Sequence, residues 1–494
     1  MYDQFAADLF TALPILIVAA AGIAVVLWDA FSNDSPGIPW LSAAAMLAAA
    51  ALEVLRLGPD VTAFAGHLYG GGAASIANLI VLVGALGSLA LSVPYLRRIG
   101  HNYGEVHALI LFAVSGMMTL ASSGSLITLF VGLETMSVCL YVLTGLVREE
   151  STANESALKY FLLGAFSTGF FLYGIALLYG ATGVMTFDEL APALLVTDRT
   201  ALFVVGVGLL LIGFFFKVSA VPFHMWTPDV YQGAPTTLTA FMSTASKAAA
   251  FAALIVVLAR ALPVGVVDGT VQVALAVVAA VTMVGGNVAA LTQTNVKRML
   301  AYSSVAHAGY ILAGLAAGTG VGYGAALFYL LAYTLMNVGA FGAISALEWD
   351  GDQGAEQTLD SLAGMGYRKP FLGVALGVFM FALTGFPPLA GFIGKYLVFA
   401  AAIDAGLVWL AVLGVLTSVV SAFYYIRVLV VLWMRQPSEA PENVQKAAFP
   451  VSTTTLIVVG VCALALLALG VLPAGLIEAT GDAFGVTDVV AVAP

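Results

Sequence analysis

The sequence predicts an all-α fold, a polytopic membrane bundle of about 14 transmembrane helices with two inverted five-helix repeats, each with one broken helix. The composition is the first observation, since 61% of the 494 residues are hydrophobic and only 9% are charged, against about 25% charged in average soluble domains. The second is a succession of apolar tracts long enough to span a bilayer. The third is that two tracts are interrupted by prolines at corresponding positions.

Each predicted span is an apolar tract of about 20 residues. The 14 tracts begin near Leu9, Pro39, Gly72, Glu105, Gly124, Glu155, Ala201, Thr236, Asp268, Val296, Val321, Phe371, Gly406 and Pro450. The fourth and fifth tracts are separated only by Ser122-Ser-Gly124. The acidic N-terminus lacks the basic region of a signal peptide, so we expect the first tract to be retained as a span.

The seventh tract is interrupted around Pro222 and the twelfth around Pro387 and Pro388. Proline cannot donate a helical hydrogen bond, and broken backbone at membrane depth needs cover from protein or from a wet cavity. Paired broken helices indicate an internal repeat with a transport site. Pro222 and Pro387 lie 165 positions apart, and the same shift moves the start of the fourth tract close to that of the ninth.

This spacing predicts four regions. They are an N-terminal three-helix segment over 1–104, a first five-helix repeat over 105–262, a second over 263–434, and a C-terminal transmembrane helix with a tail over 435–494. Because five is odd, consecutive repeats enter the membrane from opposite sides, which makes the repeat inverted.

The basic loop residues predict the orientation. Nine fall on one side of the predicted membrane, namely Arg97, Arg98, Arg148, Lys297, Arg298, Arg368, Lys369, Arg435 and Lys446. Three, Arg56, Arg199 and Arg260, fall on the other, which also holds the N-terminus. The positive-inside rule places the side with nine in the cytoplasm. Both termini are therefore expected outside. No Lys/Arg cluster exceeds a pair, so nothing indicates nucleic-acid binding.

Six charged residues fall within the apolar tracts, where each costs about 2.5–3.5 kcal/mol at a helix centre. They are Glu134, Lys159, Lys217, Lys247, Lys395 and Arg427. Such residues are functional by default, although a structural ion pair is the alternative for Glu134 and a pinned structural cation is the alternative for the lysines.

Lys217, Lys247 and Lys395 are the predicted proton carriers. Burial favours the neutral amine and a nearby carboxylate favours the ammonium, so a lysine between these effects can take and release protons. Lys217 precedes the first break, where freed carbonyls are expected to reach it. Lys395 follows the second break. Near Lys247, four hydroxyl residues at helical spacing predict a hydroxylated face: Thr236, Thr239, Ser243 and Ser246.

Lys159 and Arg427 lie near predicted helix ends. For Lys159 snorkelling to the interface and a relay role both remain open, and for Arg427 anchoring is the first interpretation. His224 lies beside the first break, and His307 forms a polar stripe with Ser303 and Tyr310. Histidine titrates in the useful range, so both are relay candidates, with a satisfied core histidine as the alternative. Neither lies in a metal-binding pattern.

The two cysteines, Cys139 and Cys462, lie inside apolar tracts without neighbouring ligands. An iron–sulfur cluster needs more thiolates than that. The sequence therefore predicts no cluster and no metal site in this chain.

Four segments carry a resemblance to a known family. They are Phe214–Asp229 with the following stretch to Lys247, Glu155–Gly164, Thr294–Ser304, and Thr384–Lys395. Together they resemble the antiporter-like subunits of respiratory complex I, and the stretch Val230–Lys247 is similar to the N subunits of NADH–quinone oxidoreductase. The lysine at 395, where M subunits carry glutamate, and the short C-terminus, where L subunits carry a lateral helix, favour the N subunits.

The resemblance implies a proton-translocating membrane subunit of NADH–quinone oxidoreductase in a bacterial cell inner membrane, without redox chemistry of its own. It implies a Glu134–Lys217 pair, a central relay lysine at Lys247 and a second-half lysine at Lys395. FMN, iron–sulfur clusters and quinone are implied in partner subunits, and an M-type subunit and small subunits such as K are implied as neighbours. A subunit of a multi-subunit cation/proton antiporter and a non-pumping structural subunit remain as alternatives.

Overall fold

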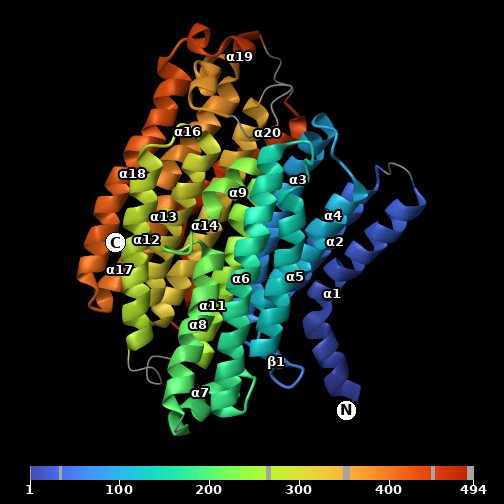
Figure 1. The fold of residues 1–494 in the computed structure, drawn as a ribbon, viewed down its shortest axis with the longest axis vertical. Coiled ribbons are helices and arrows are strands. Elements are labelled where there is room, and N and C mark those ends of the chain that lie inside the picture. The colour runs from blue at the N-terminus through green and yellow to red at the C-terminus, as the bar shows by residue number, and fades with distance from the viewer. Residues whose placement is uncertain are drawn as a thin grey trace.

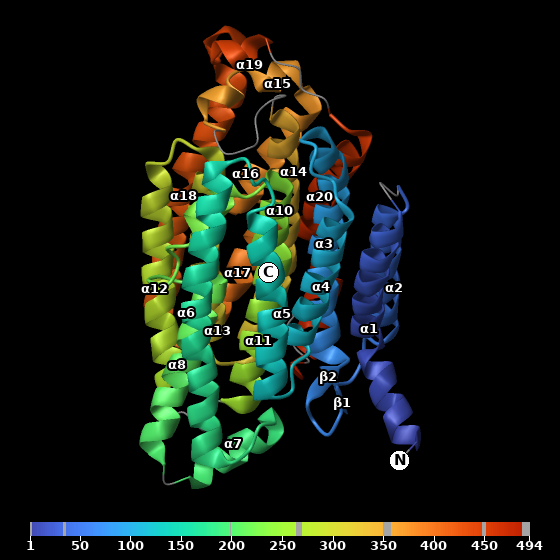
Figure 2. The ribbon, with the colours of Figure 1, turned by 45° about the vertical axis from the view of Figure 1, so that its right-hand side comes forward.

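The chain folds as a bundle of long helices that run roughly along one axis (Figures 1 and 2). A computed structural model describes residues 2–32, 36–197, 199–262, 269–348, 357–446 and 451–486. Within these residues, 13 helices are long and apolar enough to cross a membrane. A fourteenth crossing is divided between two shorter helices, α16 and α17. The predicted all-α membrane bundle is therefore confirmed.

The N-terminal segment contains three membrane helices and a small hairpin. Its elements are α1 (Tyr2–Phe31), α2 (Ile38–Leu55), β1 (Val61–Ala63), β2 (Leu68–Gly70) and α3 (Gly72–Arg98). The two strands pair antiparallel, with Thr62 opposite Tyr69. Figure 2 shows α1 and α2 together along one edge of the bundle.

The first five-helix unit follows. Its elements are α4 (Gly104–Ala121), α5 (Leu126–Thr144), α6 (Ser151–Thr182), α7 (Phe187–Val196), α8 (Thr200–Val218), α9 (Thr227–Gly233), α10 (Thr236–Phe241) and α11 (Lys247–Val256). A π-helical turn, η1 (Met242–Ser246), joins α10 to α11, and a second, η2 (Val257–Ala261), extends α11, so that Thr236–Ala261 forms one membrane-crossing helix.

The second unit and the C-terminal elements complete the described chain. The unit holds α12 (Thr270–Leu291), α13 (Val296–Ala316), α14 (Gly320–Leu347), η3 (Asp360–Leu362), α15 (Met365–Arg368), α16 (Pro370–Thr384), α17 (Ala390–Asp404) and α18 (Val408–Met434). It is followed by η4 (Pro437–Glu439), α19 (Glu442–Lys446), α20 (Thr453–Val471) and α21 (Ala474–Asp482).

The bundle has two distinct ends. We call the end with β1, β2 and α7 the hairpin end and the opposite one the α15 end (Figure 2). At the hairpin end, Arg260 forms an ion pair with Asp60, and the backbone N–H of Leu126 donates to Met185. At the α15 end, Arg98 and Glu348 form an ion pair, and Asn295 pairs with Thr358. The end of α21 also lies at the hairpin end, because Ala479 and Asp482 share a cavity there with Asp60 and Arg260.

The two units repeat with opposite orientation. Helix α4 begins at the α15 end, beside Arg97, whereas α12 begins at the hairpin end, shortly after Ala261. The pair α4–α5 corresponds to α12–α13, and each broken helix packs along the third helix of its unit, α8 and α9 on α6, and α16 and α17 on α14. The predicted inverted repeat is thus present, while the domain boundaries at 104, 262 and 434 stay a prediction.

Most predicted spans begin within a few residues of the first residue of an observed helix. The predicted starts Asp268 and Pro450 lie outside the described residues. The short connection between the fourth and fifth spans is confirmed, since α4 ends at Ala121 and α5 begins at Leu126. The sequence reading missed α7, a short helix at the hairpin end that packs against η2.

Candidate functional site

Glu134 lies in the middle of α5 and is half-buried. Its carboxylate accepts a hydrogen bond of 2.8 Å from the Thr168 hydroxyl on α6. Val131 and Val138, on the same side of α5, are more than half exposed. Glu134 therefore sits near the outer face of the bundle, with a polar partner on the next helix.

Lys217 lies in the last turn of α8 and is only 6% exposed. Among the described residues its ammonium has no hydrogen-bond partner. It lies 5.4 and 5.6 Å from the ring centroids of Tyr141 and Tyr160, whose faces attract a cation. The Glu134 carboxylate acts on it electrostatically, but none of the ion pairs among the described residues joins the two.

The break that follows Lys217 is stabilised by hydrogen bonds from its own turn to the end of α8. The Trp226 indole donates to the carbonyl of Phe216 at 2.9 Å, and the backbone N–H of Ala220 donates to that of Phe215 at 2.8 Å. These contacts occupy two carbonyls near the end of α8. The expectation that freed carbonyls would reach Lys217 was wrong, because its ammonium has no hydrogen-bond partner among the described residues.

His224 lies in the turn between α8 and α9 and is half-buried. Its Nδ1 has no hydrogen-bond partner among the described residues, and its ring lies 6.4 Å from that of Tyr302 on α13. The structure thus places His224 beside the break, as predicted, but apart from the hydrogen-bonded groups described next.

Lys247 begins α11 and is 1% exposed. Its ammonium donates to the backbone carbonyl of Ser304 at 2.8 Å and also to the Ser304 hydroxyl. Ser304 belongs to α13, so Lys247 joins the first unit to the second. Its ammonium also lies 5.7 Å from the ring centroid of Tyr333 on α14.

The hydroxyl groups that were predicted to surround Lys247 do not supply these contacts. Thr239, Ser243 and Ser246 donate to backbone carbonyls, and Thr236 donates to the carboxylate of Glu348. The π-helical turn η1 directly precedes Lys247, and its wider turn changes the register of the side chains. The hydroxyl that Lys247 contacts therefore comes from another helix.

His307, on α13, is held by two tyrosines. Its Nε2 lies 3.1 Å from the hydroxyl of Tyr425, and its Nδ1 lies 2.8 Å from the hydroxyl of Tyr329. Tyr425 also hydrogen-bonds to Ser303. The predicted stripe of Ser303, His307 and Tyr310 is confirmed as a set of buried polar groups on one helix.

Lys395 lies in α17, just after the second break, and is 5% exposed. Its ammonium donates to the carbonyls of Leu383 and Thr384 at 3.1 and 2.9 Å. These carbonyls end α16, where the helix dipole favours a cation. The ammonium also lies 4.6 Å from the ring centroid of Tyr310.

These groups form a nearly continuous line across the second unit. The ring of His307 lies 5.2 Å from that of Tyr333, which faces Lys247, and 5.5 Å from that of Tyr310, which faces Lys395. A titratable or hydroxyl-bearing side chain therefore stands at each step from Lys247 to Lys395. Such an arrangement suits the passage of protons.

Lys159 belongs to a different cluster. Its ammonium pairs with Glu155 and with Asp229, each at 2.7 Å, and Asp229 also pairs with Arg298 at 2.6 Å. Asp229 lies in α9 and Arg298 in α13, so this network ties the two units together. The Lys159 side chain is 42% exposed near the start of α6, and the interface and relay interpretations of Lys159 both stay predictions.

Sequence reasoning missed three buried charges at helix ends. Glu348 is fully buried and pairs with Arg98 at 3.4 Å. Glu53, at the end of α2, accepts hydrogen bonds from Ser75 and Asn78 at 2.6 and 2.8 Å. Lys297, predicted in a loop, is fully buried and donates to the carbonyl of Ala234 at 2.6 Å. All three fall at the edges of apolar tracts, where sequence alone cannot separate a loop from a buried turn.

Arg427 contacts the end of α12. Its guanidinium donates to the carbonyls of Leu291, at 3.2 Å, and of Gln293. These contacts agree with the anchoring interpretation. The two cysteines are free and buried, as predicted. In the described part of the chain, no three His, Cys, Asp or Glu side chains gather as a metal site would require.

Comparisons with known proteins bear on this arrangement. The family described as NADH:quinone oxidoreductase/Mrp antiporter, TM, matches residues 123–421. NADH-quinone oxidoreductase subunit N of Salinibacter ruber is 57% identical over 494 residues, covering 98% of each chain.

Two solved structures extend the comparison. A chain of respiratory complex I from Thermus thermophilus with bound aureothin has 38% identity and a TM-score of 0.81, covering 96% of this chain and 100% of that one. A chain of the Mrp complex from Dietzia sp. has a TM-score of 0.83 at 22% identity, over 100% of both chains. This second likeness concerns the fold alone.

Proposed function

Because the chain belongs to the NADH:quinone oxidoreductase/Mrp antiporter family and, within it, to the NADH-quinone oxidoreductase subunits N, we propose that it translocates protons as a membrane subunit of complex I. The observation that carries this proposal is the line of buried groups from Lys247 through Tyr333, His307 and Tyr310 to Lys395. Glu134 and Lys217 extend the route on the side of the first unit.

The electrostatics of this route suit a stepwise transfer. Lys217 is buried without a hydrogen-bond acceptor in the described residues, so its charged form depends on the position of Glu134. Moving one charge against 100 mV needs about 2.3 kcal/mol, and making or breaking one partly buried ion pair changes the free energy by a comparable amount. A shift of Glu134 relative to Lys217 can therefore pass a proton toward Lys247.

The other candidate residues take secondary places in this proposal. His307 relays protons between the two lysines, since both of its nitrogens are held by tyrosine hydroxyls. Lys159 acts through its ion pairs with Glu155 and Asp229. His224, which has no partner on Nδ1 among the described residues, exchanges protons at the break.

Redox chemistry is assigned to partner subunits. We propose that FMN, the iron–sulfur clusters and quinone bind there, and that NADH oxidation reaches this chain as a conformational or electrostatic signal. The neighbours we propose are an M-type antiporter-like subunit and small membrane subunits such as K.

The proposed location is a bacterial cell inner membrane, with the α15 end in the cytoplasm and both termini on the periplasmic side. The distribution of basic residues supports this orientation. Arg98, Arg298 and Arg368 lie toward the α15 end, whereas Arg56 and Arg260 contact residues at the hairpin end. The positive-inside rule places the first group in the cytoplasm.

Two alternatives from the sequence stay distinguishable by experiment. A subunit of a cation/proton antiporter would transport sodium without a partner that oxidises NADH, and the likeness to the Mrp complex concerns only the fold. A non-pumping structural subunit would keep its buried charges as static ion pairs, and it would tolerate a permanent cation in place of Lys247.

The test of the proposal is the pair Lys247→Ala and Lys247→Arg in the assembled complex. Alanine removes the titrating amine and keeps a good helix former, so proton pumping and NADH–quinone turnover should fall together by about tenfold or more. Arginine keeps the charge but cannot release its proton at physiological pH, so it should not restore pumping. Assembly is checked first by the amount of complex in the membrane. Near-normal pumping by the arginine variant would assign Lys247 a structural role and remove the centre of the route.

A further inference from the structure

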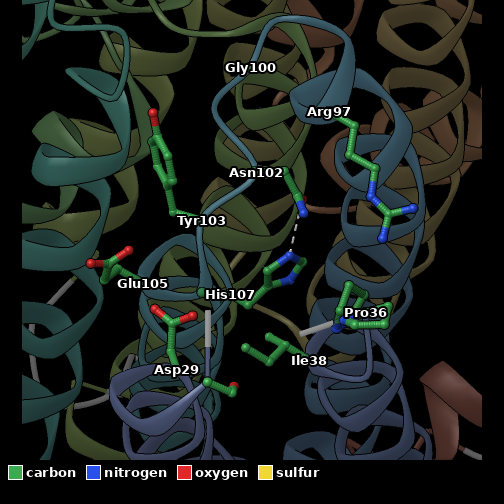
Figure 3. A pocket seen from close by; sticks show the side chains of 12 residues that line it. Asp29, Pro36, Ile38, Arg97, Gly100, Asn102, Tyr103, Glu105 and His107 are labelled. Carbon is green, nitrogen blue, oxygen red and sulfur yellow. Dashed lines mark hydrogen bonds between the residues drawn. The ribbon is translucent and has the colours of Figure 1, made fainter. Parts of the chain in front are cut away.

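A polar cavity lies at the α15 end of the N-terminal segment, away from the proton route. It measures about 880 Å³ and lies between the end of α1, the start of α2 and the α3–α4 connection (Figure 3). The charged and ring-bearing side chains on its wall are Asp29, Arg97, Tyr103, Glu105 and His107. Asp29, Arg97 and Glu105 each lie within about one turn of a helix end, so the cavity is at the level where the membrane spans begin.

His107 presents an unused acceptor to this cavity. Its side chain is almost fully buried, at 1% exposed, and its Nε2 lies 3.3 Å from the Oδ1 of Asn102. Because an amide oxygen only accepts, Nε2 carries the hydrogen and Nδ1 is the bare acceptor. Nδ1 has no hydrogen-bond partner in the described residues. A ligand that satisfies it must bring a donor.

Two carboxylates line the same cavity. Figure 3 shows Asp29 and Glu105 on the same side of the cavity as the base of His107. The Asp29 carboxylate lies directly against Gly104, where an added Cβ would meet it at 2.1–2.5 Å. Glycine at this position therefore leaves room for the carboxylate at the start of α4. Together the three groups form a set of acceptors for a ligand with several N–H donors.

Arg97 supplies the opposite charge. Its exposed guanidinium lies across the cavity from Asp29 and Glu105 (Figure 3), and guanidinium is well suited to hold a phosphate. The cavity therefore has an acceptor side and a cationic side. A dipolar ligand, with an ammonium at one end and a phosphate at the other, matches this arrangement.

The surroundings of the cavity indicate a lipid. Phe31 is 89% exposed, Trp40 is 79% exposed and Tyr103 is 49% exposed. Exposed aromatic side chains at helix ends are typical of the membrane–water interface. The cavity therefore lies at the depth of the lipid headgroups.

We propose that this cavity binds the headgroup of a phospholipid with a primary ammonium, the phosphatidylethanolamine class. The ammonium donates to Asp29, Glu105 and the Nδ1 of His107, and the phosphate accepts from Arg97. A choline headgroup has no N–H donor, and a glycerol headgroup has only neutral hydroxyls and no cation to offset the two carboxylates. The headgroup thus decides which lipid occupies the cavity.

The experiment uses the intact complex that contains this chain, reconstituted in phosphatidylcholine vesicles with a small fraction of photoreactive lipid. The reactive group is on the acyl chain, and the headgroup is ethanolamine, choline or glycerol in three parallel samples. Cross-linked peptides are then mapped by mass spectrometry. We expect the ethanolamine probe to label the α1–α2 and α3–α4 peptides, and the other two probes to label them much less.

The variants Arg97→Ala and Glu105→Gln should each reduce this labelling by about fivefold, the effect of one charge-assisted hydrogen bond at a partly exposed site. Arg148→Ala, a matched loss of an exposed arginine in the α5–α6 connection, should leave it unchanged. Equal labelling by all three probes would overturn the proposal, as would labelling that both cavity variants leave intact. Absence of lipid labelling at these peptides, with a partner subunit cross-linked there instead, would also overturn it.

Discussion

Each five-helix unit has a lysine beside its broken helix, but the two lysines have different partners. Lys217 precedes its break, where the ammonium meets the rings of Tyr141 and Tyr160 and no acceptor in the described residues. Lys395 follows its break and donates to the carbonyls of Leu383 and Thr384. The freed carbonyls belong to the upstream half-helix in both units, so only a lysine in the downstream half turns back onto them.

The two units also differ in where their acidic residues lie. The first unit has Glu134 in the middle of α5. In the second unit, the α-helices α12 to α18 carry one acid, Asp404, which is exposed at the end of α17, and the other described acids, Glu348 and Asp360, lie outside these α-helices. The second lysine thus has neutral acceptors, whereas the first has a carboxylate at a distance. The comparison suggests that an incoming signal acts on the first unit, where the charge is incompletely compensated.

The largest expected effect lies where the end of α14 in the second unit meets α3 of the N-terminal segment and α10 of the first unit. Glu348, just after α14, pairs with Arg98 and accepts from Thr236, the first residue of α10. Arg98→Ala removes the cation from a fully buried carboxylate, which costs about 3–5 kcal/mol in comparable sites. We expect a clear fall in the temperature at which the purified complex loses this subunit. The double variant Arg98→Met with Glu348→Gln removes both charges and should recover most of that stability. A single variant as stable as the double would show that this pair does not hold the second unit to the N-terminal segment.

The second effect tests the dependence of Lys217 on its distant acid. Glu134→Gln should lower NADH–quinone turnover and pumping by about tenfold, and adding Lys217→Ala should cost little more, because both changes disable the same step. Adding Lys395→Ala should instead lower turnover further, since Lys395 has its own acceptors. Coupled variants are expected to be non-additive only when they share a partner. Equal coupling of Glu134 to both lysines, measured as turnover in membranes, would contradict the difference between the units.

The smallest effect concerns one hydroxyl in the second unit. Tyr425→Phe removes the hydroxyl that Ser303 and His307 share, a loss of about 1 kcal/mol, and should reduce pumping by a few-fold without loss of assembly. Tyr424→Phe is the comparison variant, because the Tyr424 hydroxyl donates to Asn287 at 2.9 Å and, among the described residues, forms no hydrogen bond with Ser303 or His307. Equal pumping by the two variants would mean that His307 does not need Tyr425 for proton transfer.

Several features of this molecule follow from the sequence alone. Hydropathy over about 20 residues reports directly on the cost of exposing backbone and side chains to lipid, so the span count and the short connection after Ala121 could be predicted. Proline removes a donor wherever it stands, which located both breaks. A charge inside an apolar tract is costly in lipid, which singled out Lys217, Lys247 and Lys395, and all three are buried, whereas Glu134 is half-buried.

Only the tertiary structure decided which partners these charges have. Lys247 contacts Ser304, 57 positions away on another helix, and not the hydroxyls of its own helix. Glu348 and Lys297 stand at tract edges and become buried only because other helix ends cover them. Hydrogen bonds act over about 3 Å, so a partner is set by the relative position of packed helices. Helical periodicity does not specify how one helix is placed against another. The hydrophobicity of a tract, in contrast, can be read from that tract alone.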